Sequence, residues 1–300
     1  MARAPGIHLV HKPLGATSFS TLNGFLVGGP PSPRKPPKAC HGGTLDPFAD
    51  GLLLVLVGPA THLFETLHAL PKIYEVEIAW GRETDNGDPT GQVVAESSPA
   101  SLTPERIAAA SEPFIGWHDQ VPPATSAKKL GGEPAYRKAH RGEAVVLPSS
   151  RVYLHRVEWL AHGLPDTSRV RLTCRGGFYV RSFVRDLAHA LGTHAHVSAL
   201  RRTQIGPWRD PGRERPPLAL QGPQLLSWAP TRPLTDAEVG ALRQAQPVPT
   251  TGTRPPEWSA PQGYPPLPEV VGALHQGRLF GLLQIEGQTL RLQREFRGGL

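Results

Sequence analysis

Residues 41–51 read His-Gly-Gly-Thr-Leu-Asp-Pro-Phe-Ala-Asp-Gly and place one carboxylate, that of Asp46, in a stiff turn. The glycine pair at 42–43 permits backbone conformations that are closed to other residues. Pro47 fixes its own φ and disfavours helical geometry at the residue before it. Two interpretations follow: the turn presents a chemically active carboxylate, or Asp46 is the N-cap of a helix over 48–54.

Further short motifs follow one another on both sides of this turn. Together with it they make seven ordered blocks, which are far more specific than one motif because independent chance matches multiply. The other six lie at 11–18 (His-Lys-Pro-Leu-Gly-Ala-Thr-Ser), 58–61, 72–74, 84–91, 176–181 and 200–202. The seven blocks resemble those of the TruB family of pseudouridine synthases.

The resemblance implies a fold and a reaction. The fold is mixed α/β (α+β), with a central mixed, largely antiparallel sheet, flanking helices and an RNA-binding cleft across the sheet. The reaction isomerises uridine to pseudouridine at position 55 in the T-loop of tRNA. It breaks the bond from C1′ to N1 and joins C1′ to C5, on a base that has left its stack. Asp46 would attack C1′ or C6, and elimination to a glycal after attack is a further route.

The resemblance assigns catalytic roles to Asp46, Tyr74 and Arg181. Arg181 would hold the carboxylate in a bidentate geometry. Tyr74 would contact the target ring and take the C5 proton. Without the family, Arg181 is interpreted as a surface residue of a helix, and Tyr74 as a core residue on the apolar face of a half-buried strand over 73–80.

Substrate-binding roles follow from the same resemblance. His41 would brace the space that the flipped base vacates. Asp88 would complete the pocket, although in its turn of Asn, Gly, Asp and Pro it also fits a turn former. Leu200 would pack near the uracil, with simple core packing as the alternative. The remaining predicted substrate-binding residues of the pocket are Lys12, Thr44 and Tyr179.

Residues 122–150 are the predicted RNA clamp. The segment 128–156 holds seven Lys and Arg residues against two Glu. Lys128, Lys129 and Lys138 are the predicted phosphate contacts, although a solvated basic face explains the charge equally well. The string Pro-Pro-Ala-Thr-Ser-Ala-Lys that opens this segment resembles the insertion with which bacterial members grip the T-arm.

Two positions depart from the family pattern. His62 stands where Lys is common after Ala-Thr, and Thr125 stands where an aromatic residue often precedes Ser-Ala. Neither is a predicted catalytic residue. We therefore expect the departures to change local phosphate contacts and loop packing.

The composition is compatible with these expectations. The 300 residues are 39% hydrophobic and carry a formal net charge of +7, which favours a polyanionic partner such as tRNA. Two cysteines are too few for a disulfide framework, no apolar run is long enough to span a membrane, and the first residues have no signal-peptide core. We expect a cytoplasmic monomer that needs neither a membrane nor an obligate protein partner.

A metal or cofactor site is not expected. The reaction is an isomerisation, and the sequence has no nucleotide or redox motif. Cys40 with His41, and the histidines His189, His194 and His196, lack the Cys-x-x-Cys or His-Glu-x-x-His spacing of a metal site. Solvated or core histidines are the preferred interpretation.

Proline marks the domain boundary. Fifteen of the 34 prolines lie between Pro207 and Pro268, so this span is not mostly helix or central strand. We expect a catalytic domain over 1–230, followed over 231–300 by a Pro-rich connector and a reduced PUA-like RNA-binding domain. The alternative is a β appendage that only packs on the main domain.

Hydrophobic periodicity and turn signals predict the main elements. Helices are expected at 61–70, 104–114 and 179–191. In addition to 73–80, strands are expected at 7–12, 52–57, 91–96, 151–160, 169–175, 199–205, 270–274, 279–285 and 289–295.

Two other functions fit part of the sequence. A guide-RNA-dependent rRNA pseudouridine synthase shares the Asp motif, but the insertion at 122–150 favours an enzyme that works alone. A non-catalytic RNA-binding or RNA-folding protein needs the basic surface and the tail but not Asp46.

Overall fold

The computed structural model describes residues 4–28, 37–126, 128–130, 133–135, 141, 143, 145 and 147–300. Of the predicted clamp residues, Lys128 is described in full and Lys129 by its backbone alone. Lys138 lies outside the described residues. The statements below concern the described part of the chain.

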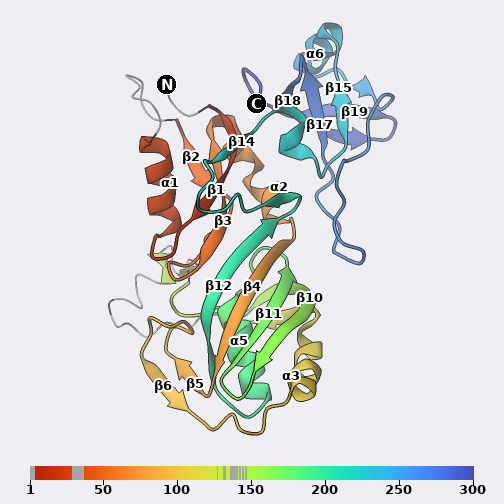
Figure 1. The fold of residues 1–300 in the computed structure, drawn as a ribbon. Helices are drawn as coiled ribbons and strands as arrows, with labels where there is room; N and C mark the ends of the chain where they lie inside the picture. Colours follow the sequence, from red (N-terminus) through yellow and green to blue (C-terminus); the bar gives the residue numbers. More distant parts are fainter. Residues whose placement is uncertain are drawn as a thin grey trace.

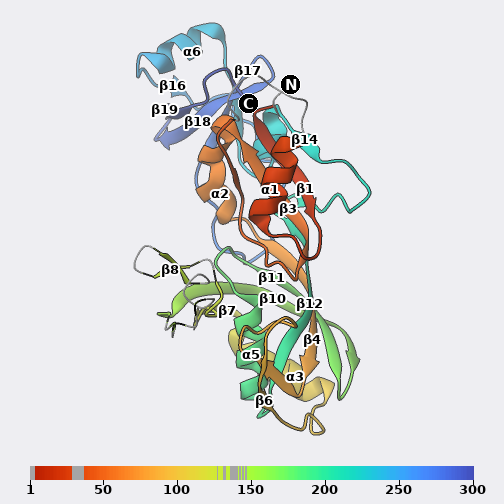
Figure 2. The same cartoon turned by 90° about the vertical axis from the view of Figure 1, so that its left-hand side faces the viewer.

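A ten-stranded sheet forms the centre of the molecule (Figures 1 and 2). Its pairings are antiparallel apart from that of β3 with β12, which confirms the predicted mixed, largely antiparallel sheet. In spatial order the main path is β14 (Leu218–Leu220), β1 (Gly6–Lys12), β3 (Asp50–Val57), β12 (Ala195–Ile205), β4 (Lys72–Trp80), β11 (Thr167–Cys174), β10 (Ser150–Gly163) and β7 (Gly116–Gln120). Two short strands complete it: β2 (Ala39–His41) pairs with β3, and β13 (Trp208–Arg209) with β12.

Strand β3 is buried on both faces because helices cover it on each side. Leu53, Val55 and Val57 pack against α1 (Ser18–Val27), whereas the alternate leucines face the opposite core beneath α2 (Phe64–His68). All eight residues of the strand are buried. The alternative in which Asp46 caps a helix over 48–54 is therefore wrong, since most of that segment belongs to β3.

Strand β4 shows the alternation that its sequence predicts. Tyr74, Val76, Ile78 and Trp80 are buried, and the residues between them are partly exposed. The buried side chains share a core with the apolar stripe of α5 (Val180–Ala190), which the sequence also predicts. The predicted helix over 104–114 is α3 (Pro104–Ser111) followed by a 3₁₀ helix (Glu112–Phe114), and the predicted helix over 61–70 is a 3₁₀ helix (Gly58–Leu63) that continues into α2.

The last seventy residues form a second, five-stranded sheet, drawn in blue tones in Figure 1. Its own core, which includes Val271 and Leu283, is covered by α6 (Asp236–Arg243), while Leu282, Phe296 and Leu300 pack against the main domain. The strands follow the order β15 (Thr231–Pro233), β17 (Val271–His275), β18 (Arg278–Glu286), β19 (Thr289–Glu295) and β16 (Val248–Pro249).

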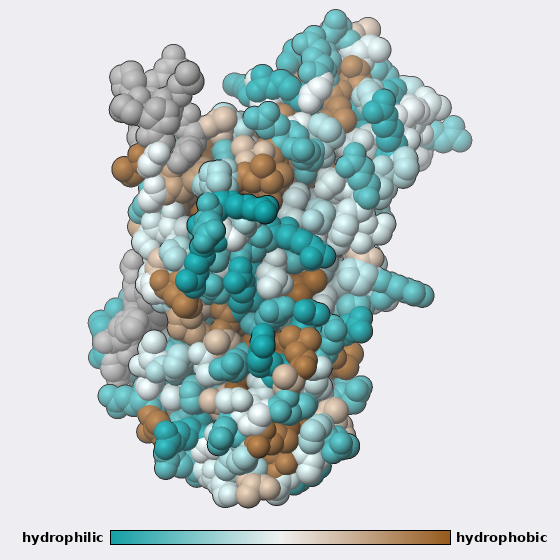
Figure 3. Space-filling view, in the orientation of Figure 1, coloured by the Kyte–Doolittle hydropathy of each residue, from teal (hydrophilic) through white to brown (hydrophobic). Residues whose placement is uncertain are grey.

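The face of the molecule in Figure 3 is mainly hydrophilic, and its apolar residues lie in small separate groups. None of the helices in the described ranges is long and apolar enough to cross a membrane.

Gly51 lies where β3 meets β12, and we predict that it accepts no side chain. Its φ is 111°, and a Cβ there would lie 2.3 Å from the carbonyl oxygen of Arg202. Gly51→Ala should lower the free energy of unfolding by more than about 3 kcal/mol, measured by urea denaturation. Gly212 is the control, because its φ is 88° but nothing lies within 4 Å of a Cβ. Gly212→Ala should cost about 1 kcal/mol. Equal losses would show that the close approach of β12 is unimportant.

Candidate active site

A cleft of about 510 Å³ opens between the turn that holds Asp46 and the start of α5. Eight of the predicted residues line it, although they come from distant parts of the sequence. Lys12 and Asp88 do not line it. The eight are His41, Thr44, Asp46, Tyr74, Lys128, Tyr179, Arg181 and Leu200.

Asp46 and Arg181 form a bidentate ion pair in this cleft. Arg181 Nε lies 2.9 Å from Asp46 Oδ2, and Arg181 Nη2 donates to Asp46 Oδ1 at 3.1 Å. The Arg181 side chain is 5% exposed, whereas that of Asp46 is 27% exposed. The guanidinium is thus fixed within the protein, while the carboxylate remains open to a ligand in the cleft.

The third nitrogen of Arg181 fixes the guanidinium from the other side. Nη1 donates to the carbonyl oxygen of Asn86 and to the hydroxyl of Thr125, both at 2.7 Å. Thr125 is one of the two departures from the family pattern, and here its hydroxyl contacts the arginine. The arginine therefore joins the Asp46 turn, the 84–91 turn and the segment after β7.

Asp88 organises the 84–91 turn. Its Oδ1 accepts hydrogen bonds from Asn86 Nδ2 at 2.9 Å, and from the backbone nitrogen and hydroxyl of Thr90 at 2.8 and 2.6 Å. Its Oδ2 lies 3.9 Å from Arg181 Nη1. Asp88 contacts the site through Asn86 and Arg181, so the geometry matches the turn-former interpretation.

Ser18 and Arg202 hold the backbone just before Asp46. The Ser18 hydroxyl bonds both the backbone nitrogen and the carbonyl oxygen of Leu45, at 2.9 and 3.0 Å. The guanidinium of Arg202, which is almost fully buried, donates to the carbonyl oxygens of Gly43, Thr44 and Leu52. Because both side chains bond main-chain atoms, they fix the position of the turn itself.

Lys12 holds the turn from the other end. Its ammonium donates to the carbonyl oxygens of Pro13, Ala16 and Pro47, and the residue is fully buried. Burial lowers the pKa of Lys12 to about 8, against the opposing effects of Asp46 and Asp50. This geometry favours a role in positioning the loop that carries Asp46.

Burial also shifts the pKa of the ring side chains in the cleft. It lowers the pKa of His41, with a further contribution from Arg202, so the imidazole is uncharged at neutral pH. It raises the pKa of Tyr74, which the nearby Arg202 opposes, and it raises the pKa of Tyr179. Both phenols are therefore protonated at neutral pH.

Tyr179 is held at the start of α5 by its backbone. The side chain of Gln120 accepts from the Tyr179 nitrogen at 2.8 Å and donates to its carbonyl oxygen at 3.0 Å. Gln120 ends β7 and is 2% exposed. These two hydrogen bonds fix the helix terminus from which Arg181 points to Asp46.

The rim of the cleft is basic. Lys128, Arg151 and Arg175 line it, and the Lys128 ammonium donates to the carbonyl oxygen of Pro148 and the hydroxyl of Ser150. The structure thus places one of the three predicted clamp lysines in the lining of the cleft that holds Asp46. The Lys129 side chain and Lys138 lie outside the described residues.

Comparisons with known proteins agree on one family. The sequence model of the family described as TruB family pseudouridylate synthase (N terminal domain) matches residues 33–180. A second family model, described as tRNA pseudouridylate synthase B C-terminal domain, matches residues 181–214. A protein of Mycobacterium tuberculosis (strain CDC 1551 / Oshkosh) named tRNA pseudouridine synthase B is 37% identical over 263 residues, which are 84% of this chain and 86% of the relative. The chain belongs to the TruB family.

A second curated relative and a solved structure are also similar to this TruB protein. The tRNA pseudouridine synthase B of Xanthomonas campestris pv. campestris (strain 8004) is 40% identical over 69% of this chain, but the match spans 65% of the length of that relative. Among solved structures, the Cbf5-Nop10-Gar1 complex contains a chain with a TM-score of 0.64 and 19% identity, covering 97% of this chain and 84% of the other. This likeness shows the shared fold.

Residues that position the TruB turn were not assigned roles from the sequence. Ser18 and Arg202 stand in the 11–18 and 200–202 blocks, in which only Lys12 and Leu200 were assigned roles. Lys72 opens the 72–74 block, lines the cleft and donates to the carbonyl oxygen of His68 at 3.1 Å. Their positions in the motif blocks were the signal that could have found them, because a polar residue in such a motif either takes part in the reaction or positions a residue that does.

We predict that Lys72 makes the stability of the fold rise with pH. Burial, with a contribution from Arg202, lowers the pKa of Lys72 from 10.5 to about 7. Between these values the unfolded chain binds more protons than the folded one, so the free energy of unfolding increases with pH. Lys72→Met keeps a long side chain without the charge and should remove this part of the slope. Chemical denaturation of both proteins from pH 7 to pH 10 measures it, and parallel curves would contradict the prediction.

Proposed function

We propose that this protein isomerises uridine to pseudouridine at position 55 in the T-loop of tRNA, with Asp46 as the nucleophile and no cofactor. The observation that carries the proposal is the Asp46–Arg181 ion pair in a cleft with a basic rim. The family and the names of the relatives at 37–40% identity support the reaction and the substrate. Attack at C1′, attack at C6 and elimination to a glycal remain alternatives.

The site suits a nucleophile that must be oriented before the base arrives. Arg181 fixes both carboxylate oxygens of Asp46, so the carboxylate loses little rotational freedom when the substrate binds. A uridine outside its stack would enter the cleft with His41 at one wall and Leu200 packed near the uracil. Because the His41 ring is uncharged, it braces the RNA by packing and hydrogen bonding.

The proton at C5 has to leave after the new C–C bond forms, and Tyr74 is the proposed acceptor. Its phenol enters the reaction protonated, since burial raises its pKa. To accept the C5 proton, Tyr74 must first lose its own phenolic proton to solvent in the cleft that it lines, and the phenolate then takes the proton from C5. The guanidinium of Arg202 lies 6.0 Å from the centre of the Tyr74 ring and favours the phenolate, which makes this step easier.

The experiment that tests the function uses purified protein and an unmodified tRNA transcript, without guide RNA or partner proteins. We expect pseudouridine at the T-loop position alone, produced by a protein that elutes as a monomer. Turnover that requires a guide RNA would favour the guide-dependent class. Binding without any turnover would leave an RNA-binding or RNA-folding protein.

The fork geometry of Arg181 gives a sharper prediction. Arg181→Lys keeps the charge but loses the paired contacts with Asp46 and the bonds to Asn86 and Thr125. Single-turnover rates should fall by at least about 100-fold, because the Asp46 carboxylate is no longer held in the orientation that Arg181 gives it.

Arg185→Lys is the matched control for this variant. It lies one turn further along α5, bonds Asp186 and the carbonyl oxygen of Val121, and does not line the cleft. Its rate should stay near that of the wild type. An equal rate for Arg181→Lys would contradict the proposed role of the ion pair.

The clamp is tested by replacing Lys128, Lys129 and Lys138 together by Gln. Each lost phosphate contact should lower the slope of log affinity against log salt by about 0.7–0.9. The single-turnover rate of pseudouridine formation at saturating enzyme should stay unchanged. The control variant removes three arginines that do not line the cleft, Arg82, Arg106 and Arg169. If both triple variants change the slope equally, the lysines act only through net charge.

The tail and the cellular setting complete the proposal. Residues 231–300 would act as a reduced PUA-like domain that extends the RNA-binding surface of the catalytic domain over 1–230. The protein would work in the cytoplasm, without an obligate protein partner.

A further inference from the structure

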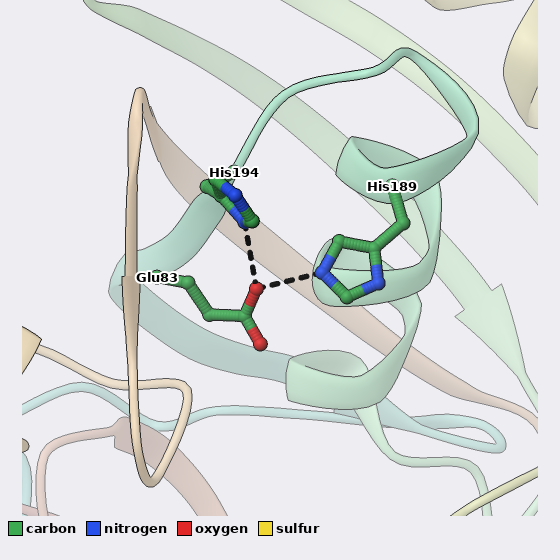
Figure 4. A group of neighbouring side chains, drawn as sticks. All are labelled: Glu83, His189 and His194. Carbon is green, nitrogen blue, oxygen red and sulfur yellow. Dashed lines mark hydrogen bonds and ion pairs between the residues drawn. The ribbon is translucent and has the colours of Figure 1, made fainter. Parts of the chain in front are cut away.

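Glu83, His189 and His194 form a cluster away from the cleft, and none of the three lines it. Glu83 Oε2 lies 2.6 Å from His189 Nε2 and 3.0 Å from His194 Nδ1. Figure 4 shows both rings directed at this one carboxylate oxygen. One carboxylate oxygen can accept from both rings, and a cation placed between the three groups would bind the same three side chains.

The three side chains come from separate elements. Glu83 lies in β5 (Arg82–Thr84), which pairs with β6 (Val93–Glu96), while His189 lies in the last turn of α5. His194 precedes β12, and its backbone is fixed independently of the ring. The His194 carbonyl oxygen accepts from Gly81 N at 2.7 Å, and its nitrogen donates to Ser97 Oγ at 3.0 Å. The backbone therefore presents the His194 ring to Glu83 whether or not an ion binds.

The donor set selects the class of cation. Two imidazole nitrogens and one carboxylate oxygen are typical ligands of Zn²⁺ and similar transition metals, whereas Mg²⁺ and Ca²⁺ prefer oxygen alone. The three ligand atoms lie within 4.8 Å of one another. The side chains of His189 and His194 are 48% and 30% exposed, so an ion and a water molecule can reach them from solvent.

We propose that Glu83, His189 and His194 bind one Zn²⁺-class ion, with water in the remaining position, and that the ion fastens the β5–β6 hairpin to the end of α5. The turn of this hairpin supplies the carbonyl oxygen of Asn86 to Arg181, in the first turn of the same helix. The ion and Arg181 thus hold the hairpin at opposite ends of α5. Motif spacing misses the site because Glu83 precedes His189 by 106 residues.

Metal titration of the full chain tests the site. Protein treated with a chelator and then freed of it is titrated with Co²⁺, whose visible absorption reports the geometry, and with Zn²⁺ in competition with a chromophoric chelator. We expect one ion per chain, a rise in melting temperature with Zn²⁺, and no competition from excess Mg²⁺. Absence of saturable Zn²⁺ binding, or displacement by Mg²⁺, would overturn the proposal.

Variants locate the bound ion. Glu83→Gln preserves the shape and a hydrogen-bond acceptor, and it should weaken Zn²⁺ binding by more than about tenfold, as should His189→Ala. His196→Ala is the control: its ring donates to the carbonyl oxygen of Arg82 rather than joining the cluster, so wild-type affinity is expected. Equal affinity in Glu83→Gln, His189→Ala and the wild type would place the ion elsewhere. Circular dichroism confirms that the variants are folded, and the readouts do not depend on uridine turnover.

Discussion

The guanidinium of Arg181 joins parts of the chain that are far apart in sequence. It grips Asp46 with two nitrogens and binds Asn86 and Thr125 with the third, so three loops meet at one almost buried side chain. A buried cation of this kind is stabilising only when its donors are satisfied. The shape of the cleft therefore depends on this arginine, and so does the orientation of the carboxylate.

The surrounding buried cations extend the same arrangement. Arg202 and Lys12 bond main-chain carbonyl oxygens on either side of Asp46, while Ser18 fixes Leu45 between them. These side chains lie beneath the turn and hold its backbone, whereas Arg181 holds its reactive group. Basic residues in this family member thus occupy two kinds of position: some hold the turn from within, and others, including Lys128, Arg151 and Arg175, line the cleft.

The sequence predicted much of the fold because its signals there are local. The alternation in β4 and the stripe of α5 each follow from one period, and both are confirmed. Helix α1 was not predicted, although Thr17 caps it, because its apolar residues do not gather on one face: Leu22 and Phe25 are buried, whereas Phe19 and Val27 are exposed. Family motifs identified eight of the residues that line the cleft, whereas Lys12 and Asp88 do not line it. Asp88 bonds within its own turn, as the turn-former interpretation predicts, whereas the bonds of Lys12 to backbone carbonyl oxygens follow no sequence pattern. The Glu83 cluster was not predicted either, because its residues come from distant parts of the chain.

The most direct test of the account is a single-turnover comparison of the wild type with Asp46→Asn, which replaces one oxygen and removes the negative charge. Two quantities are measured side by side: the formation of pseudouridine at a saturating excess of enzyme, and the affinity of the enzyme for tRNA. We expect no detectable product and near-wild-type affinity, because the basic rim and the cation network are retained. Turnover by Asp46→Asn at a rate comparable to the wild type would contradict the assignment of Asp46 as the nucleophile.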